Sequence, residues 1–181
     1  MFAYMSCLNP GDEIIVTDPS YANYMAFAIS CGAVVKSVKT HIEDGFKLPP
    51  VEEFEKQITP KTRAILICNP NNPTGYLYTK QEMRQIRDLV KKYKLYLISD
   101  EVYREFIYTK SPYISACHLE GIEQNVILVD SVSKRYSECG IRIGALITKN
   151  KAVREAVMKF CQARLYDQIG RAVQQECRDR Y

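Results

Sequence analysis

The segment Asp130-Ser131-Val132-Ser133-Lys134-Arg135 directly follows the apolar run Val126-Ile127-Leu128-Val129. A short apolar run of this kind is typical of a buried strand. The pattern therefore predicts a strand that ends in a serine-rich turn carrying one lysine. Open α/β sheets bind ligands along the edge formed by the carboxyl ends of their strands. We expect the Lys134 amine to lie at such an edge.

Two earlier segments show the same arrangement of an apolar run followed by polar residues. Residues 64–68 precede Asn69-Pro70-Asn71-Asn72-Pro73-Thr74-Gly75, and residues 96–98 precede Ser99-Asp100-Glu101-Val102-Tyr103. Three successive strands would therefore bring an amide, a carboxylate with a phenol, and an amine to one edge of a sheet. These are the groups needed to hold pyridoxal 5′-phosphate (PLP).

The rest of the chain alternates apolar runs with helical patterns. Thr79 and Glu82 have the spacing of a capping box at the start of a helix. This alternation predicts an α/β fold of three layers, with a mainly parallel sheet and helices on both faces. The predicted strands are residues 13–17, 33–38, 64–68, 95–99, 126–129 and 144–148, and the predicted helices are residues 21–31, 51–57, 79–92 and 151–164.

The order and spacing of these motifs resemble those of the fold-type-I, class I/II PLP-dependent aminotransferases, in the branch that includes the aspartate aminotransferases. Asp100 lies 28 residues after Asn72, Lys134 lies 34 residues after Asp100, and Arg142 lies eight residues after Lys134. A lone Ser-x-Ser-Lys would be weak evidence. The whole series of Asn-Pro-Thr-Gly, Asp-Glu-x-Tyr, Ser-x-Ser-Lys and a distal arginine is specific, and the resemblance covers residues 9–165.

The resemblance implies a role for each motif residue. Lys134 would form the internal aldimine with PLP and then act as the general base that moves the substrate Cα proton. Asp100 would pair with the pyridine nitrogen and keep the ring protonated, which makes it a better electron sink. Asn72 and Tyr103 would hydrogen-bond the 3′ oxygen of the cofactor. The resemblance also implies a cis peptide bond between Asn72 and Pro73.

The remaining implied contacts concern the phosphate and the faces of the cofactor ring. Arg142 resembles the family's phosphate-binding arginine, because a planar guanidinium suits a phosphate dianion. Ser131 and Ser133 could donate hydroxyls to the same group, and Ser131 is the better candidate. Tyr21 matches the aromatic residue that stacks on the ring, whereas Tyr24 is the better candidate for the core.

Each motif residue also has a structural interpretation. Lys134 alone would be read as a surface lysine in a turn, and Asp100 as a strand-end residue that accepts hydrogen bonds from turn amides. The motif series favours the functional interpretation for both. We expect Glu101 to make structural hydrogen bonds, and Arg135 to point away from the site because it is adjacent to Lys134.

Composition narrows the class of protein. The 181 residues, 46% hydrophobic and 25% charged, fit one ordinary soluble domain. The net charge of +4 is spread over scattered lysines, which gives no support for nucleic-acid binding. No apolar run approaches the roughly 18 residues of a membrane span, so we expect a cytoplasmic protein with no membrane contact. No metal-ligand spacing is visible, and we expect free thiols at all seven cysteines: Cys7, Cys31, Cys68, Cys117, Cys139, Cys161 and Cys177.

Both ends differ from the family pattern. Residues 1–7 resemble the end of a longer helix, which in this family follows a phosphate-binding loop. After residue 165 the family continues into a C-terminal domain that supplies the arginine for the substrate α-carboxylate. We therefore expect residues 1–165 to be a partial PLP-binding large domain and residues 166–181 to be a divergent or truncated tail, with the small domain absent. Such a fragment should be inactive alone, and the full-length protein should be a homodimer.

The leading function hypothesis is an aminotransferase that moves an amino group from an α-amino acid, aspartate-like, to a 2-oxo acid such as 2-oxoglutarate. A PLP-dependent C–S lyase on the same fold is the first alternative, because the same site residues serve both reactions. The second is a non-catalytic aminotransferase-like module, for example in a transcription regulator. A regulator would need a helix-turn-helix segment, and none is visible in the sequence.

Overall fold

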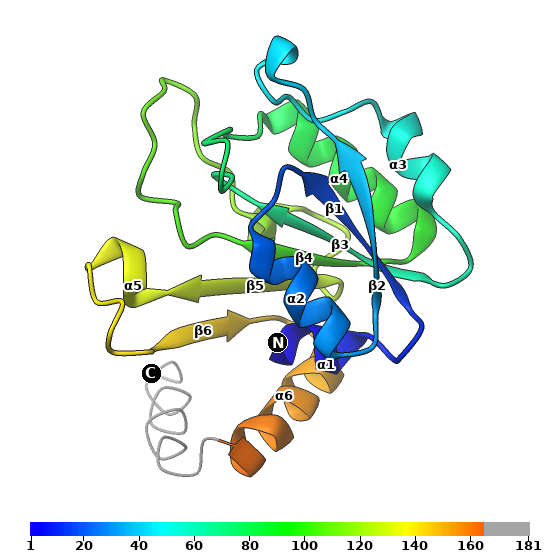
Figure 1. The fold of residues 1–181 in the computed structure, drawn as a ribbon, viewed down its shortest axis with the longest axis vertical. Coiled ribbons are helices and arrows are strands. Elements are labelled where there is room, and N and C mark those ends of the chain that lie inside the picture. The colour runs from blue at the N-terminus through cyan, green and yellow to red at the C-terminus, as the bar shows by residue number, and fades with distance from the viewer. Residues whose placement is uncertain (165–181) are drawn as a thin grey trace.

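A computed structural model describes residues 1–164, which form a six-stranded sheet with helices on both faces (Figure 1). The strand order is β2-β1-β3-β4-β5-β6. Strands β1 to β5 are parallel, and β6 pairs with β5 in the antiparallel direction. The prediction of a mainly parallel α/β sheet is therefore confirmed. The strands are β1 Glu13–Asp18, β2 Val34–Lys39, β3 Thr62–Cys68, β4 Tyr96–Asp100, β5 Val126–Ser131 and β6 Gly144–Ile147.

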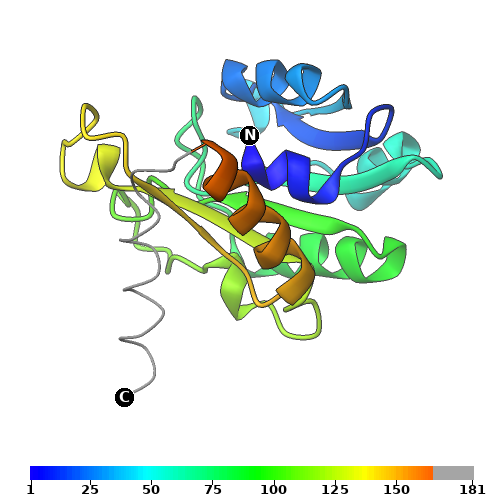
Figure 2. The same cartoon turned by 90° about the horizontal axis from the view of Figure 1, so that it is seen from below.

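The helices lie in two layers, one on each side of the sheet (Figure 2). Helices α3 and α4 cover one face, and α1, α2 and α6 cover the other. The helices are α1 Phe2–Cys7, α2 Ala22–Ser30, α3 Val51–Gln57, α4 Lys80–Tyr93, α5 Val132–Arg135 and α6 Lys151–Arg164, with 3-10 turns at Ile42–Asp44 and Ala116–His118. The predicted tail, residues 166–181, lies outside the described residues.

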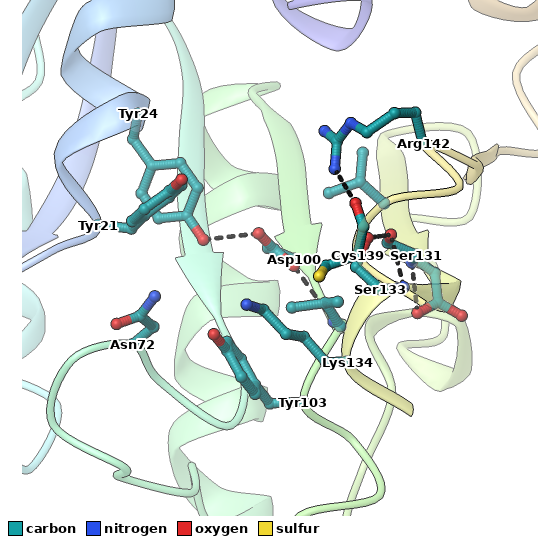
Figure 3. Close-up of a pocket in the computed structure, with 13 residues that line it drawn as sticks. Tyr21, Tyr24, Asn72, Asp100, Tyr103, Ser131, Ser133, Lys134, Cys139 and Arg142 are labelled. Carbon is teal, nitrogen blue, oxygen red and sulfur yellow. Dashed lines mark hydrogen bonds between the residues drawn. The ribbon is translucent and has the colours of Figure 1, made fainter. Parts of the chain in front are cut away.

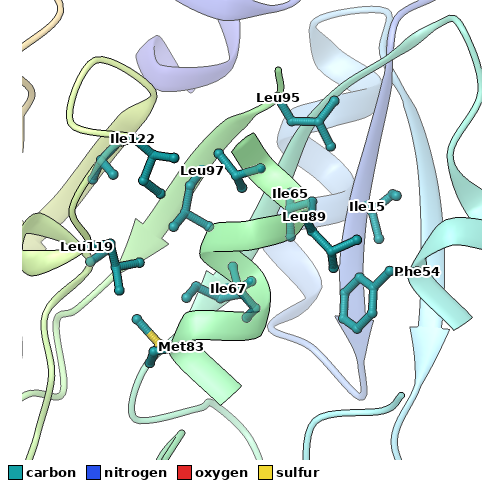
Figure 4. Close-up of a cluster of buried hydrophobic side chains, with 14 of the residues drawn as sticks. Ile15, Phe54, Ile65, Ile67, Met83, Leu89, Leu95, Leu97, Leu119 and Ile122 are labelled. Atoms are coloured by element: carbon teal, nitrogen blue, oxygen red, sulfur yellow. The ribbon is translucent and has the colours of Figure 1, made fainter. Parts of the chain in front are cut away.

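Buried side chains on both faces explain why the strands read as continuous apolar runs. Along β3, Ile65 and Ile67 pack under α3 and α4 (Figure 4), while Ala64 and Leu66 pack toward α1, α2 and α6. Successive side chains of a strand point to opposite faces. A parallel strand covered on both sides therefore needs apolar residues at nearly every position.

Helix α4 fixes the loop that precedes it. The predicted capping box is present, because Thr79 Oγ1 accepts from the Glu82 amide at 3.2 Å and Glu82 Oε2 accepts from the Thr79 amide at 2.7 Å. Met83, Ile86 and Val90 are buried along one face of the helix. Their spacing of three and four residues gives the apolar stripe that holds α4 on the sheet.

The predicted elements differ from the structure mainly at their ends. Tyr21 and Cys31 are the caps of α2 and not helical residues, and β4 begins and ends one residue later than predicted. The serine-rich turn contains a short helix, α5, that the sequence did not predict. No helix within residues 1–164 is long and apolar enough to cross a membrane. The six cysteines of the described part are all free thiols, and Cys177 lies outside it.

Candidate cofactor site

A cavity of about 310 Å³ opens at the carboxyl edge of β3, β4 and β5 (Figure 3). Five residues that the sequence did not single out for the site also contribute to its wall: Tyr24, Val102, Val129, Asp130 and Cys139. The cavity brings together all eight predicted site residues, which are Tyr21, Asn72, Asp100, Tyr103, Ser131, Ser133, Lys134 and Arg142.

Asp100, the last residue of β4, presents a largely buried carboxylate to the cavity. Its Oδ2 accepts a hydrogen bond from the Tyr24 hydroxyl at 2.7 Å, and its Oδ1 accepts from the Val102 amide at 3.2 Å. It forms no salt bridge with any residue of the described chain. Burial raises the pKa of Asp100, and the two hydrogen bonds lower it. A carboxylate in this position would gain from a cationic ligand such as a protonated pyridine.

Two tyrosines at the start of α2 line the cavity beside Asp100, Tyr21 as the N-cap of the helix and Tyr24 in its first turn. Tyr24 is 7% exposed and Tyr21 is 41% exposed, and their rings make an edge-to-face contact with centroids 5.5 Å apart. Tyr24 is a core residue, as predicted, but its hydroxyl also reaches Asp100. The sequence carried one signal for this second role, because the hydroxyl of a buried tyrosine usually has a hydrogen-bond partner.

Lys134 lies in α5, a single helical turn whose N-cap is Ser131. Ser131 Oγ accepts a hydrogen bond from the Ser133 amide at 3.1 Å and so fixes the start of the turn. Figure 3 shows the Lys134 amine extending into the cavity, toward the space between Asn72 and Tyr103. Among residues 1–164 this amine has no hydrogen-bond or ion-pair partner, so it is available to a ligand.

Asn72 projects from a loop that is held by its own backbone. The Asn71 amide donates to the Tyr76 carbonyl at 2.8 Å, and the Gly75 amide donates to the Asn71 carbonyl at 2.8 Å. Gly75 has φ +72°, a conformation that glycine adopts without steric cost. The predicted cis bond between Asn72 and Pro73 is present. The loop therefore presents the Asn72 side chain to the cavity from a fixed backbone.

Glu101 and Arg135 have the structural surroundings that the sequence predicted. Glu101 is fully buried, and its Oε1 accepts from Ser99 Oγ at 3.0 Å and from the Ala116 amide at 2.8 Å. Its other oxygen accepts from the Tyr113 hydroxyl. Arg135 does not line the cavity and instead pairs with acidic residues behind it.

The side of the cavity formed by the β5–α5 turn and the segment before β6 suits an anion. Ser131 Oγ lies 2.8 Å from Ser133 Oγ and 3.1 Å from the Ile143 carbonyl oxygen. Arg142 has φ +57°, and its Nη1 donates to the Cys139 carbonyl at 2.8 Å. In the described structure no carboxylate pairs with its guanidinium. An unpaired arginine beside two hydroxyls can bind a phosphate dianion through charge-assisted hydrogen bonds.

The donor set of the cavity fits PLP on chemical grounds. Asp100 offers a buried carboxylate without a cation, Arg142 offers a cation without a carboxylate, and Lys134 offers a free amine. PLP carries the complementary groups, which are a basic ring nitrogen, a phosphate and an aldehyde. These complementary groups belong to one small molecule, and all three protein groups line one cavity.

Comparisons with known proteins agree with this chemistry. Residues 1–176 match the family model described as aminotransferase class I and II. The chain is 38% identical over 158 residues to an aspartate aminotransferase of Thermotoga maritima, covering 87% of this chain and 41% of that protein. It is 35% identical over 148 residues to an arginine–pyruvate transaminase of Pseudomonas aeruginosa, covering 81% of this chain and 37% of that protein.

Solved structures give the same result. The crystal structure of an aromatic aminotransferase from Pyrococcus horikoshii superposes with a TM-score of 0.85 at 34% identity, covering 91% of this chain and 43% of that one. The Thermotoga maritima aspartate aminotransferase superposes with a TM-score of 0.85 at 35% identity, with the same coverage of both chains. The chain spans about two fifths of the length of these relatives. By family model, sequence identity and fold, the chain belongs to the class I and II aminotransferases.

Proposed function

We propose that this protein binds PLP in the cavity and transfers an amino group from an α-amino acid to a 2-oxo acid. The observation that carries the proposal is the joint presence of a partly buried Asp100 carboxylate without a cation and an unpaired Lys134 amine in one cavity. Family membership supports it, because relatives named aminotransferases match 81–88% of this chain. When bound, PLP supplies a ring that stabilises negative charge at the substrate Cα.

In this proposal the protein's own residues bind and orient the cofactor. Lys134 would hold the cofactor covalently and would then be placed to accept the proton that leaves the substrate Cα. Asp100, held by Tyr24, pairs with the ring nitrogen and keeps it protonated. Asn72 and Tyr103 donate hydrogen bonds to the 3′ oxygen. Each of these assignments is a proposal about a residue that lines the cavity.

The phosphate and the ring face complete the proposed set of contacts. Arg142, Ser131 and Ser133 bind the phosphate, and Tyr21 covers one face of the ring. Tyr21 suits this role because the residue is 41% exposed and its ring is held edge-to-face by Tyr24. A partly exposed aromatic ring at the start of a helix is a ready stacking surface.

We further propose an aspartate-like amino donor with 2-oxoglutarate as acceptor, in a full-length homodimer. The named relatives include aspartate, aromatic-amino-acid and arginine–pyruvate enzymes at 35–38% identity, so identity does not rank the donors. A donor series of aspartate, phenylalanine and arginine, each with 2-oxoglutarate and with pyruvate, ranks them directly. Cystathionine in the same series tests the C–S lyase alternative, which would release a thiol.

The covalent attachment is tested independently of turnover. The chain is mixed with PLP, reduced with borohydride and digested, and the labelled peptide is identified by mass. We expect the label on Lys134, and none on that peptide in Lys134→Ala. Lys149→Ala is the matched control, because Lys149 is an exposed lysine outside the cavity. If the label is spread over several lysines in the unchanged chain and its distribution is the same in Lys134→Ala, the assignment is rejected.

A further inference from the structure

A group of four charged side chains lies beside the cavity, with Asp130 in the cavity wall, and it links residues next to two of the proposed cofactor contacts. Asp130 Oδ2 lies 2.9 Å from Arg104 Nη2 and 3.2 Å from Arg135 Nη2. Asp130 Oδ1 accepts from the Ser131 amide at 2.8 Å. Glu105 contacts Arg135 from the solvent side, with its Oε1 3.4 Å from Arg135 Nε. The Asp130 carboxylate is therefore bound on both oxygens.

Each arginine of this group directly follows a residue that we propose to contact the cofactor. Arg104 follows Tyr103, and Arg135 follows Lys134. Tyr103 is on the turn after β4, and Lys134 is on the turn of helix after β5. No hydrogen bond joins Tyr103 to Lys134 in the described structure, and both side chains end in the cavity (Figure 3). The Asp130 carboxylate is the less exposed of two ionic links between the segments, since the Glu105–Arg135 pair forms the other on the solvent side.

The surroundings of Asp130 give this link rigidity. The side chains are only partly exposed, at 13% for Asp130, 20% for Arg135 and 29% for Arg104. Partly buried ion pairs are screened less by solvent than exposed ones. Asp130 also lines the cavity itself, one residue beyond the strand partner of Asp100. Its two arginines cancel a negative charge that would otherwise compete with Asp100 for a cationic ligand.

We propose that Asp130 is a positioning residue that holds Arg104 and Arg135 together and thereby sets the spacing between the Tyr103 phenol and the Lys134 amine. Its value to catalysis rests on the proposed function, in which both groups contact one cofactor. The spacing itself does not depend on PLP. The link joins the turn after β4 to the end of β5, so its loss leaves each strand intact and leaves only the exposed Glu105–Arg135 pair between the two turns.

The spacing can be measured directly in the 181-residue chain without cofactor. A difluorodinitrobenzene reagent joins an amine to a phenol only when the two lie close together, and the linked peptides are identified by mass. The test compares the yield of the Tyr103–Lys134 link in the unchanged chain and in Asp130→Asn. Glu105→Gln is the matched control, because it removes from the same two arginines a carboxylate whose side chain is 56% exposed, and an exposed ion pair contributes little. Thermal unfolding of each variant is recorded beside the yield.

We expect the link to form in the unchanged chain and in Glu105→Gln, and to fall about tenfold in Asp130→Asn, the change that follows from losing one charge-assisted hydrogen bond. Arg104→Gln removes only the Arg104–Asp130 contact and should also lower the crosslink yield. This variant replaces Asp130→Asn in the test if Asp130→Asn does not fold. An equal yield in a folded Asp130 or Arg104 variant, or no link in the unchanged chain, overturns the proposal.

A second readout connects the spacing to the cofactor. A phenol that donates to the 3′ oxygen stabilises its anionic form, so a displaced Tyr103 should raise the pH midpoint of the visible absorbance of bound PLP. We expect that midpoint to rise in Asp130→Asn and to stay unchanged in Glu105→Gln. If the unchanged chain binds no PLP, the proposed function fails while the crosslink still decides the role of Asp130. If PLP binds and neither readout moves, the positioning role fails and the proposed function stands.

Discussion

Removing one hydroxyl beside Asp100 should destabilise the protein in a pH-dependent way. Tyr24→Phe keeps the buried ring and deletes the donor that lies 2.7 Å from Asp100 Oδ2. A hydrogen bond to a charged group contributes about 1.5–3 kcal/mol to stability, and a neutral one about 0.5–1.5 kcal/mol. At neutral pH we therefore expect a loss of about 1.5–3 kcal/mol in the free energy of unfolding. This corresponds to a fall of about 3–12 °C in Tm for a chain of this size.

The sign of the pH dependence follows from the direction of the Asp100 shift. Burial raises the pKa of Asp100 above its ordinary 3.8, so the folded state disfavours the charged carboxylate, and this cost is present above the raised pKa. Tyr24→Phe removes a group that lowers this pKa and therefore increases the cost. As the pH falls through the raised pKa toward 3.8, Asp100 becomes protonated in both proteins. The penalty of Tyr24→Phe should then shrink toward about 0.5–1.5 kcal/mol, the range for a neutral hydrogen bond.

Urea unfolding at neutral pH and at about pH 4, near the ordinary pKa of a carboxylate, measures both values. Tyr21→Phe is the matched control, because its hydroxyl accepts from Asn23 at the surface, and this variant should change stability by less than about 0.5 kcal/mol at either pH. A penalty for Tyr24→Phe that is equal at the two pH values, or larger in acid, would refute the assignment of a charged Asp100 held by Tyr24.

Three further predictions concern the phosphate end, the core and the helix that follows the Asn72 loop. Arg142→Gln should weaken PLP binding by about tenfold to a hundredfold and leave the affinity for pyridoxal, which has no phosphate, unchanged; absorbance titration with both ligands checks this. Ile67→Ala, at a fully buried position of β3, should cost about 2–5 kcal/mol in urea unfolding, whereas Ile42→Ala, at a position 70% exposed, should stay within about 0.5 kcal/mol. Thr79→Ala removes the capping box of α4 and should cost about 0.5–2 kcal/mol in the same assay, with Lys80→Ala, at the exposed next residue, close to neutral.

The sequence predicted the elements of the fold because each has a local signature. The apolar runs of β3, β4 and β5 are buried from both sides, so they stand out against the amphipathic helices between them. The capping box at Thr79 is encoded within four residues. Strand order and the reversed direction of β6 have no comparable signature. They depend on which strands pair across the sheet, and pairing is a non-local property.

The composition of the site was predictable for a related reason. In a parallel sheet, polar residues that directly follow neighbouring strands meet at one edge, so the order of motifs along the chain gives their proximity in space. Seven of the eight predicted residues lie at or just after the ends of β1, β3, β4 and β5 and line the cavity for this reason, whereas Arg142 reaches it because the antiparallel strand β6 begins at the same edge. The sequence indicates Tyr24 as a core residue and gives no partner for its hydroxyl. A buried tyrosine needs a partner for its hydroxyl, and Asp100 provides one.

The ion pairs that orient these residues could not be predicted from the sequence. Arg104, Asp130 and Arg135 come from two segments about 30 residues apart, and nothing in either segment marks which charges will pair. Strand pairing decides this, because β4 and β5 are neighbours and their ends bring Asp130 beside the Arg104 turn. Local motifs therefore specify which chemical groups reach the edge of the sheet, whereas the distances between those groups are set by pairings that form only in the folded chain. A variant such as Asp130→Asn, which keeps every side chain proposed to contact the cofactor and changes only what positions two of them, separates these two levels experimentally.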